Sequence, residues 1–346
     1  MTEATVVLPK ETMRALTELT GEARTDVALT LMMRDYARQK MKVLVCDPIA
    51  AEGIQMIRKA GIKVDVKTNL ASEELERIIG DYDAIVVRSA TKVRKPLIEA
   101  GKNLKLIVRA GVGLDNVDAE YAQARGIEVM NTPAASSNAV AELTVGYLLA
   151  LARHLPQTTA SLRAGKWEKK RFSGSEIAGK TLGLVGYGRI GWLVAKKALD
   201  LGMEVIAYDP YVTDPKGLEM EFVSLEELLN RADYISLHLL LTEETRNLID
   251  KPQFEMMKDG VCIINCARGG TINEDALYEA IRSGKVRGAA LDVYAEEPAK
   301  DNKLFELDEV IGSPHIGAET VEAQHRVSVE VAERVIEFHI SLRGTK

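Results

Sequence analysis

Short apolar runs alternate with amphipathic stretches along the chain from residue 41 onward. Residues 41–48 begin as an apolar strand and end in a turn, and residues 71–79 have apolar side chains at helical spacing. Further strand-length runs in this first series are Val64–Val66, Ala84–Val87, Leu104–Val108 and Ile127–Met130. Strands that alternate with helices in this way predict a parallel sheet covered by helices on both faces.

A second series of strands and helices begins near residue 181. A long helical pattern over residues 139–155 and a basic, turn-rich connector over residues 164–172 separate it from the first. A final amphipathic helix is expected over residues 319–341. The strands expected in this series are Thr181–Gly186, Glu204–Tyr208, Tyr234–Leu237, Val261–Asn265, Gly288–Leu291 and Val310–Ile311. The pattern predicts an α/β fold with two doubly wound parallel sheets.

Residues 1–40 follow a different pattern, with a short strand at Thr5–Leu8 followed by two helices. This order resembles the ribbon-helix-helix fold of small bacterial and archaeal repressors. Those repressors carry basic side chains on the strand, whereas Thr5–Leu8 has none. The segment also has equal numbers of basic and acidic residues. We therefore interpret it as a small βαα appendage for dimerisation or packing rather than as a DNA-binding element.

Composition and charge narrow the range of functions. The chain has 346 residues, a length typical of two domains, and its 45 basic and 51 acidic residues leave a net charge of −6. An acidic balance argues against nucleic acid as the main partner. There is no apolar run of membrane-spanning length and no signal-peptide pattern, so a cytoplasmic protein is expected. Three cysteines without zinc spacing predict reduced, buried thiols and no metal site.

A glycine-rich segment, Gly-Tyr-Gly-Arg-Ile-Gly at residues 186–191, lies between a predicted strand and a predicted helix. Its first glycine permits a tight turn, the second lets the backbone approach a pyrophosphate, and the third lets the helix pack on the strand. Asp209 ends the next predicted strand. An acid at that place binds the ribose hydroxyls and repels a 2′-phosphate, so the sequence predicts NAD as cofactor.

Several further segments, in the same order, resemble those of the D-isomer-specific 2-hydroxyacid dehydrogenase family. They are Val87–Val93, Arg109–Asp118, Asn265–Gly270, Ala290–Tyr294 with Glu297-Pro298, and Pro314–Ala318. The resemblance is strongest to the branch that oxidises D-3-phosphoglycerate, in a short form that lacks the C-terminal regulatory domain of many members. Feedback by serine is therefore not expected.

The resemblance implies two Rossmann-like domains and a homodimer formed through the NAD-binding domain. Residues 140–317 would form that domain, and residues 41–139 with 318–346 a discontinuous, flavodoxin-like substrate domain. The family usually has proline where Leu240 stands, so a different loop shape is expected after His238. The implied cofactor contacts are Val112, Gly186, Gly188, Arg189, Ile190, Gly191, Asp209, His238, Cys266, Ala267, Arg268, Asp292, His315, Gly317 and Ala318.

Oxidation of a 2-hydroxy acid removes a hydride from C2 and a proton from the hydroxyl, so it needs a base and a cation for the carboxylate. The resemblance makes His315 the acid/base. It makes Glu297, rather than the adjacent Glu296, the carboxylate that fixes the imidazole tautomer and stabilises the protonated ring. Arg268 suits a planar carboxylate and could polarise the carbonyl oxygen in the reverse direction.

A phosphorylated substrate needs additional cations and hydrogen-bond donors. The resemblance implies that Arg88, Ser89, Arg109 and the backbone after Gly111 supply them. Lys169, in the basic connector, is either a phosphate ligand offered to the second subunit or part of a solvated charge run.

The implied reaction is NAD-dependent oxidation of D-3-phosphoglycerate to 3-phosphohydroxypyruvate, which leads to L-serine. One alternative is a reductase of glyoxylate, hydroxypyruvate or another 2-oxo acid, since these enzymes share the same His, Glu and Arg set. A different class is an NAD-sensing transcriptional corepressor that contacts DNA through residues 1–40. The complete catalytic set and the uncharged strand at Thr5–Leu8 favour an enzyme.

Overall fold

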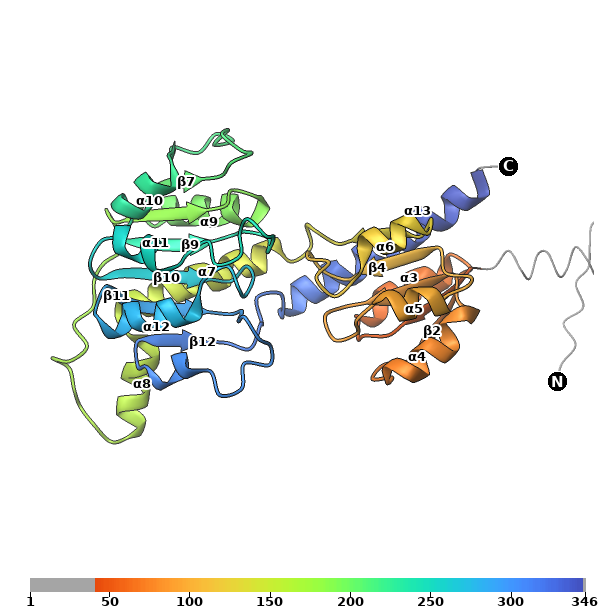
Figure 1. The fold of residues 1–346 in the computed structure, drawn as a ribbon, viewed down its shortest axis with the longest axis horizontal. Helices are drawn as coiled ribbons and strands as arrows, with labels where there is room; N and C mark the ends of the chain where they lie inside the picture. The colour runs from red at the N-terminus through yellow and green to blue at the C-terminus, as the bar shows by residue number, and fades with distance from the viewer. Residues whose placement is uncertain (1–40, 345–346) are drawn as a thin grey trace, which may run out of the picture. The chain divides into compact units, whose positions relative to one another are not determined.

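The structure, a computed structural model, describes residues 41–344 and divides them into two units (Figure 1). The first unit comprises residues 41–110, Leu114–Asn131 and the chain from Ser328 onward. The second comprises Gly111–Gly113 and Thr132–Val327. The segment predicted to be ribbon-helix-helix-like, residues 1–40, lies outside the described residues.

A five-stranded parallel sheet in the order β2-β1-β3-β4-β5 forms the centre of the first unit. The central strands β1, β3 and β4 are almost entirely buried, which explains why they are apolar apart from Lys42 at the start of β1 and Arg109 at the end of β4. The strands are β1 (Lys42–Val45), β2 (Lys63–Val66), β3 (Ala84–Val87), β4 (Leu106–Arg109) and β5 (Glu128–Asn131). The helices are α3 (Ala51–Lys59), α4 (Ser72–Ile78), α5 (Lys95–Ala100), α6 (Ala119–Ala124) and α13 (Val321–Gly344), with a 3-10 turn at Ile79–Asp81.

A seven-stranded parallel sheet in the order β12-β11-β10-β9-β6-β7-β8 forms the centre of the second unit. Its strands are β6 (Thr181–Val185), β7 (Glu204–Tyr208), β8 (Glu221–Phe222), β9 (Tyr234–Leu237), β10 (Val261–Asn265), β11 (Val286–Leu291) and β12 (Val310–Gly312). Its helices are α7 (Ser137–Arg153), α8 (Leu155–Arg163), α9 (Arg189–Asp200), α10 (Leu225–Arg231), α11 (Lys251–Met256) and α12 (Glu274–Arg282), with a 3-10 turn at Lys303–Glu306. Both sheets confirm the predicted fold class.

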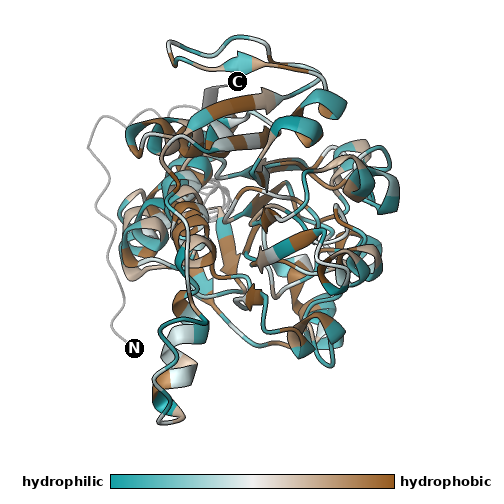
Figure 2. Cartoon of the chain, turned by 90° about the vertical axis from the view of Figure 1, so that its left-hand side faces the viewer, coloured by the Kyte–Doolittle hydropathy of each residue, from teal (hydrophilic) through white to brown (hydrophobic). Residues whose placement is uncertain are grey.

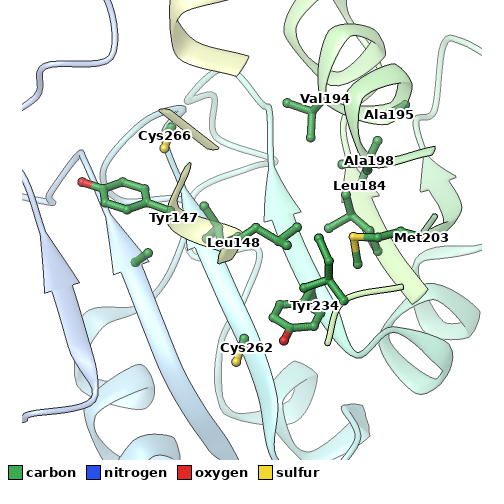
Figure 3. Close-up of a cluster of buried hydrophobic side chains, with 14 of the residues drawn as sticks. Tyr147, Leu148, Leu184, Val194, Ala195, Ala198, Met203, Tyr234, Cys262 and Cys266 are labelled. Carbon is green, nitrogen blue, oxygen red and sulfur yellow. The ribbon is translucent and has the colours of Figure 1, made fainter. Parts of the chain in front are cut away.

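Successive residues of the second unit's strands pack on opposite faces of the sheet. On one face, Leu184 and Cys262 pack with Leu148 of α7 and Val194 of α9 (Figure 3). The opposite face packs against α10, α11 and α12. Figure 2 shows hydrophobic residues, in brown, along the strands and many hydrophilic residues, in teal, on the surrounding helices and loops. Burial on both faces stabilises the sheet through the hydrophobic effect.

Two elements differ from the prediction for local reasons. The helix expected over residues 139–155 is α7, which ends at Arg153 because His154 adopts a left-handed conformation (φ 53°), and the helix α8 beyond it was not predicted. Pro156 then occupies the first turn of α8, where a missing amide is tolerated. Strand β8 was not predicted, because two residues are too few to show an alternating pattern.

The boundaries of the units, at residues 131/132 and 327/328, differ from the expected 139/140 and 317/318. All of α7 belongs to the second unit, where its side chains join the core beside α9. Within α13 the division falls at Ser328, whose hydroxyl accepts a hydrogen bond from the Gly53 amide and donates one to the Ala50 carbonyl. The part of that helix from Ser328 onward therefore belongs with α3 in the first unit.

The three cysteines are free and buried, as predicted. No helix within residues 41–344 is long and apolar enough to cross a membrane.

Candidate active site

The predicted cofactor and catalytic residues of the second unit lie along one edge of its sheet. Because the strands are parallel, their carboxyl ends share this edge, which is where ligands bind in open α/β sheets. The order across the edge is Asp209 after β7, the glycine segment after β6, His238 after β9, Arg268 after β10, Asp292 after β11 and His315 after β12. The strand order therefore places the predicted nucleotide-binding residues at one side of this edge and the predicted acid/base residue at the other.

The glycine segment leaves open space for a dinucleotide at the start of α9. Apart from its chain neighbours, no atom of the described chain lies within 4 Å of the position that a Cβ at Gly188 would take. Gly186 has a φ of 99°, and a Cβ there would lie 2.6 Å from the His238 carbonyl oxygen. Arg189 and Ile190 open α9, whose amides favour an anion. This region fits NAD.

Asp209 holds the backbone around this cradle. Its carboxylate accepts hydrogen bonds from the amides of Tyr187 (2.8 Å), Tyr211 (2.8 Å) and Val212 (3.1 Å). The same side chain therefore joins the glycine segment to the loop after β7. Its contact with the ribose hydroxyls stays a prediction.

His315 and Glu297 form a hydrogen-bonded pair. His315 Nδ1 lies 2.8 Å from Glu297 Oε2, and Glu297 Oε1 accepts a 3.2 Å bond from the Tyr294 amide. Partial burial raises the pKa of the Glu297 carboxyl, but the hydrogen bond and charge of His315, the Tyr294 amide and the charge of Arg268 bring that pKa below its usual value. Glu297 is therefore ionised at neutral pH, and Nε2 of His315 remains to exchange a proton.

Asp292 anchors the backbone of the loop that carries His315. His315 has a left-handed backbone with a φ of 54°, a conformation that costs energy for a residue other than glycine. Asp292 is only 1% exposed, and its carboxylate accepts hydrogen bonds from the backbone amides of Ile316 (2.8 Å) and Gly317 (2.7 Å). Two amides that directly follow the histidine are thereby anchored.

Arg268 follows β10 and is close enough to Glu297 for its charge to lower the Glu297 pKa. Its guanidinium donates to the Ala267 carbonyl (2.6 Å), and its own carbonyl accepts from the Thr271 hydroxyl (2.8 Å). Burial raises the pKa of the neighbouring Cys266 thiol to about 12, so this thiol stays protonated and is no nucleophile. Among the remaining predicted cofactor residues, Val112 belongs to the second unit and Ala318 follows Gly317.

In the first unit, Arg88 and Arg109 lie at the carboxyl ends of adjacent strands. The register pairs Val87 of β3 with Arg109 of β4, so Arg88 follows its strand at the same edge. Asp47, which is 4% exposed after β1, accepts bonds from the Arg88 amide (2.5 Å) and the Thr91 amide (3.1 Å). This fixes the loop that contains Ser89.

Lys169 is not grouped with the acid/base residues of its own chain. It is exposed and lies two residues before Arg171, which forms an ion pair with Asp308 (3.4 Å). Asp308 precedes β12, whereas His315 follows that strand, so the two lie at opposite ends of it. A role for Lys169 within a second subunit stays a prediction.

His238 is held neutral beside the glycine segment. Its Nε2 lies 3.0 Å from the Ser236 hydroxyl, and its buried Nδ1 has no hydrogen-bond partner among the described residues. Burial lowers the pKa of His238 to about 4.

This burial predicts a pH dependence of stability. Below about pH 6.5 the unfolded chain binds a proton at His238 that the folded chain does not bind until about pH 4. The free energy of unfolding should therefore fall by up to about 3 kcal/mol as pH falls through this range. Urea titrations should show a shallower fall for His238→Gln than for the wild type. Parallel curves for His238→Gln and wild type would refute the prediction.

Several residues that organise the site were not predicted from the sequence. Their roles depend on hydrogen bonds to residues distant in the sequence. Asp47 could have been recognised from the sequence, because a polar residue directly after a buried strand lies at the ligand-binding edge of the sheet. The unpredicted residues that organise the site are Asp47, Asn116, Tyr147, Tyr294 and Ser313. Among them, the Asn116 side chain donates a hydrogen bond to the Arg88 carbonyl (2.6 Å).

Comparison with known families and proteins agrees with this geometry. Residues 145–317 match the NAD-binding domain of the D-isomer-specific 2-hydroxyacid dehydrogenases. Hydroxypyruvate reductase of Thermotoga maritima is 51% identical over 299 residues, which cover 86% of this chain and 97% of that protein. D-3-phosphoglycerate dehydrogenase of Methanocaldococcus jannaschii is 52% identical over 299 residues, covering 85% of this chain but 57% of that protein. The chain thus spans little more than half the length of the second relative.

Two solved structures share the fold. The TT0316 protein of Thermus thermophilus is 36% identical, with a TM-score of 0.80 and coverage of 87% of this chain and 97% of that one. D-lactate dehydrogenase of Aquifex aeolicus, solved with NAD and lactic acid, is 30% identical, with a TM-score of 0.78 and coverage of 87% and 96%.

Proposed function

The chain belongs to the D-isomer-specific 2-hydroxyacid dehydrogenases, whose cofactor is NAD, and on this premise we propose that it oxidises D-3-phosphoglycerate to 3-phosphohydroxypyruvate. The observation that carries the acid/base assignment is the 2.8 Å contact between His315 Nδ1 and Glu297 Oε2. It leaves Nε2 as the nitrogen that can take a proton. The product would enter L-serine synthesis.

In the proposed reaction, bound NAD would supply the acceptor for the hydride from C2 of the substrate. His315 Nε2 takes the hydroxyl proton as the C–O bond becomes a carbonyl, and Glu297 stabilises the resulting imidazolium through Nδ1. Arg268 binds the substrate carboxylate with its forked guanidinium and, in the reverse direction, polarises the carbonyl oxygen. The C2 hydride and the hydroxyl proton account for the two electrons and two hydrogens removed from the alcohol.

The phosphate assignment rests on the paired cations at the edge of the first sheet. Arg88 and Arg109 supply two positive charges at adjacent strand ends, and Asp47 orders the loop between Arg88 and Thr91. A dianionic phosphate is the substrate group that such a pair suits best. Ser89 and the backbone after Gly111 are the further donors in this proposal, with Lys169 from a second subunit.

Hydroxypyruvate is the competing substrate, because the Thermotoga maritima relative, of which the chain covers 97%, is a hydroxypyruvate reductase. The two candidate oxo acids differ only in the phosphate group. Purified protein should oxidise NADH with 3-phosphohydroxypyruvate at a kcat/KM at least about tenfold above that with hydroxypyruvate, because only the first engages both arginines. A preference for hydroxypyruvate would overturn the phosphoglycerate assignment and leave the dehydrogenase class intact.

Removing both arginines should erase this preference. In the double variant Arg88→Gln, Arg109→Gln, the KM for 3-phosphohydroxypyruvate should rise on the order of a hundredfold through loss of two charge-assisted contacts. Steady-state kinetics with hydroxypyruvate should change far less. Arg125→Gln is the matched control, because this exposed arginine follows α6 and precedes β5, at the amino end of the sheet. Equal losses on both substrates would contradict the phosphate role.

We further propose a homodimer formed through the second unit. Helix α8 and the connector after it expose Leu155 (52%), Leu162 (57%) and Trp167 (85%). Figure 2 shows this helix extending away from the sheet. Exposed apolar side chains on a projecting segment are typical of a subunit interface. Light scattering on the full chain measures the assembly directly.

A further inference from the structure

Tyr147 is a core residue of α7 whose hydroxyl reaches the loop that carries His315. The residue is 6% exposed and belongs to the buried cluster between α7, α9 and the sheet. Figure 3 shows the hydroxyl pointing away from the other labelled side chains. At that end it forms a hydrogen bond with the Ser313 hydroxyl. A residue outside the predicted site thus touches the segment that holds the acid/base.

The direction of these hydrogen bonds follows from proton counting. Ser313 has one hydroxyl proton, which it donates to Oδ1 of Asp292, so its oxygen must accept the bond from Tyr147. Burial, and the nearby charge of Asp292, raise the pKa of Tyr147 well above its usual range. The phenol therefore stays protonated and remains a donor at every working pH. The bonds form a chain from Tyr147 through Ser313 to Asp292.

The last acceptor in this series of hydrogen bonds is the Asp292 carboxylate, which anchors the loop that carries His315. Oδ1 of Asp292 accepts both the Ser313 hydroxyl and the Ile316 amide, and Oδ2 accepts the Gly317 amide (2.7 Å). On the other side of the loop, the Tyr294 hydroxyl lies 2.9 Å from both the Ser313 and the Leu291 carbonyl oxygens and shares its one proton between them. His315 lies between these anchors in a left-handed backbone, which needs support from its surroundings. A change in the orientation of the Asp292 carboxylate would therefore shift the backbone at residues 316 and 317 and, with it, the imidazole of His315.

We propose that Tyr147 is a positioning residue for His315. Its hydroxyl fixes the Ser313 hydroxyl, which fixes the Asp292 carboxylate, which in turn sets the backbone on which the imidazole stands. This inference rests on the acid/base role proposed for His315. Without the phenolic donor, the Ser313 hydroxyl gains other rotamers, and the imidazole spends less time in its reactive position.

The test is the Tyr147→Phe variant of the full chain, measured in single turnovers of NADH with the better oxo-acid substrate. The rate should fall about five- to tenfold, the scale of one lost hydrogen bond. The affinity for NADH and the KM for the oxo acid should stay within about twofold, because Tyr147 is not assigned to either ligand. Ser313→Ala should have a similar effect, and the double variant should be no slower than the slower single variant, since both break one chain.

Tyr234→Phe is the matched control. Tyr234 is 1% exposed in the same cluster, and its hydroxyl bonds the Ser175 hydroxyl (3.3 Å) and Arg287 (3.2 Å) at the start of β9. It should lower the melting temperature without slowing the single turnover. An unchanged rate in Tyr147→Phe, or a loss that merely follows stability or NADH affinity, would overturn the inference. A wild-type protein inactive on both oxo acids would instead refute the proposed function, and the positioning role with it.

Discussion

We expect the His315→Asn variant to reduce NADH-dependent turnover of the oxo acid on the order of a thousandfold, the contribution of a positioned acid/base. Asparagine suits this test because it tolerates the left-handed backbone that residue 315 adopts, with a φ of 54°. Its side-chain amide can also replace Nδ1 as the donor to Glu297. The variant therefore removes Nε2, the proton-exchanging atom, and little else.

Three measurements make this result specific. The kcat should fall while NADH affinity, followed by fluorescence, and the melting temperature stay near the wild-type values. Glu297→Gln should lower kcat by about tenfold or more, because the imidazolium loses its anionic partner. The adjacent Glu296→Gln is the matched control and should stay within about twofold, since Glu297 is the one of these two glutamates that the structure pairs with the His315 imidazole. If His315→Asn retained a tenth of the activity, another group would be the acid/base.

The second large effect is expected at the glycine segment, where Gly188→Ala should weaken NADH binding on the order of a hundredfold without destabilising the protein. A Cβ at residue 188 meets no atom of the described chain within 4 Å except its neighbours, so the fold accommodates it. The same methyl would fill the space through which the backbone approaches a pyrophosphate. Calorimetric titration with NADH and thermal unfolding separate the two effects.

Gly186→Ala is the contrasting variant. Here the added Cβ would lie 2.6 Å from the His238 carbonyl oxygen, and the φ of 99° is itself unfavourable for alanine. This substitution should lower the melting temperature as well as NADH affinity. If Gly188→Ala bound NADH like the wild type, the dinucleotide would not pass over this part of the segment.

Local pattern was enough to predict most of the secondary structure. Strands such as Ala84–Val87 are buried on both faces, and burial leaves a continuous apolar run that stands out from its amphipathic neighbours. Prediction failed at helix α8, which the left-handed His154 separates from α7. It also failed where an element was too short for any period, as in β8.

The candidate site was predictable to the extent that its residues carry distinctive chemistry. Segment 186–191 and Asp209 were recognised because glycine spacing between a strand and a helix has a specific physical purpose. His315, Glu297 and Arg268 were recognised through resemblance, and the structure brings the first two within 2.8 Å. Lys169 had no comparable signal, and within its own chain it lies away from them.

The sequence by itself determined the fold class and the cofactor, because strand and helix periods and the glycine segment are local properties of the chain, and it indicated the family through the resemblance of its motifs. Only the tertiary structure decided which side chains support the predicted ones. Tyr147 and Ser313 form a hydrogen bond although they are 166 residues apart in the sequence, and Asp47 and Arg88 do so although they are 41 residues apart. No sequence pattern links the members of either pair. Such pairs arise from the order of strands in a sheet and the helix that packs on it, and a linear pattern does not contain that information.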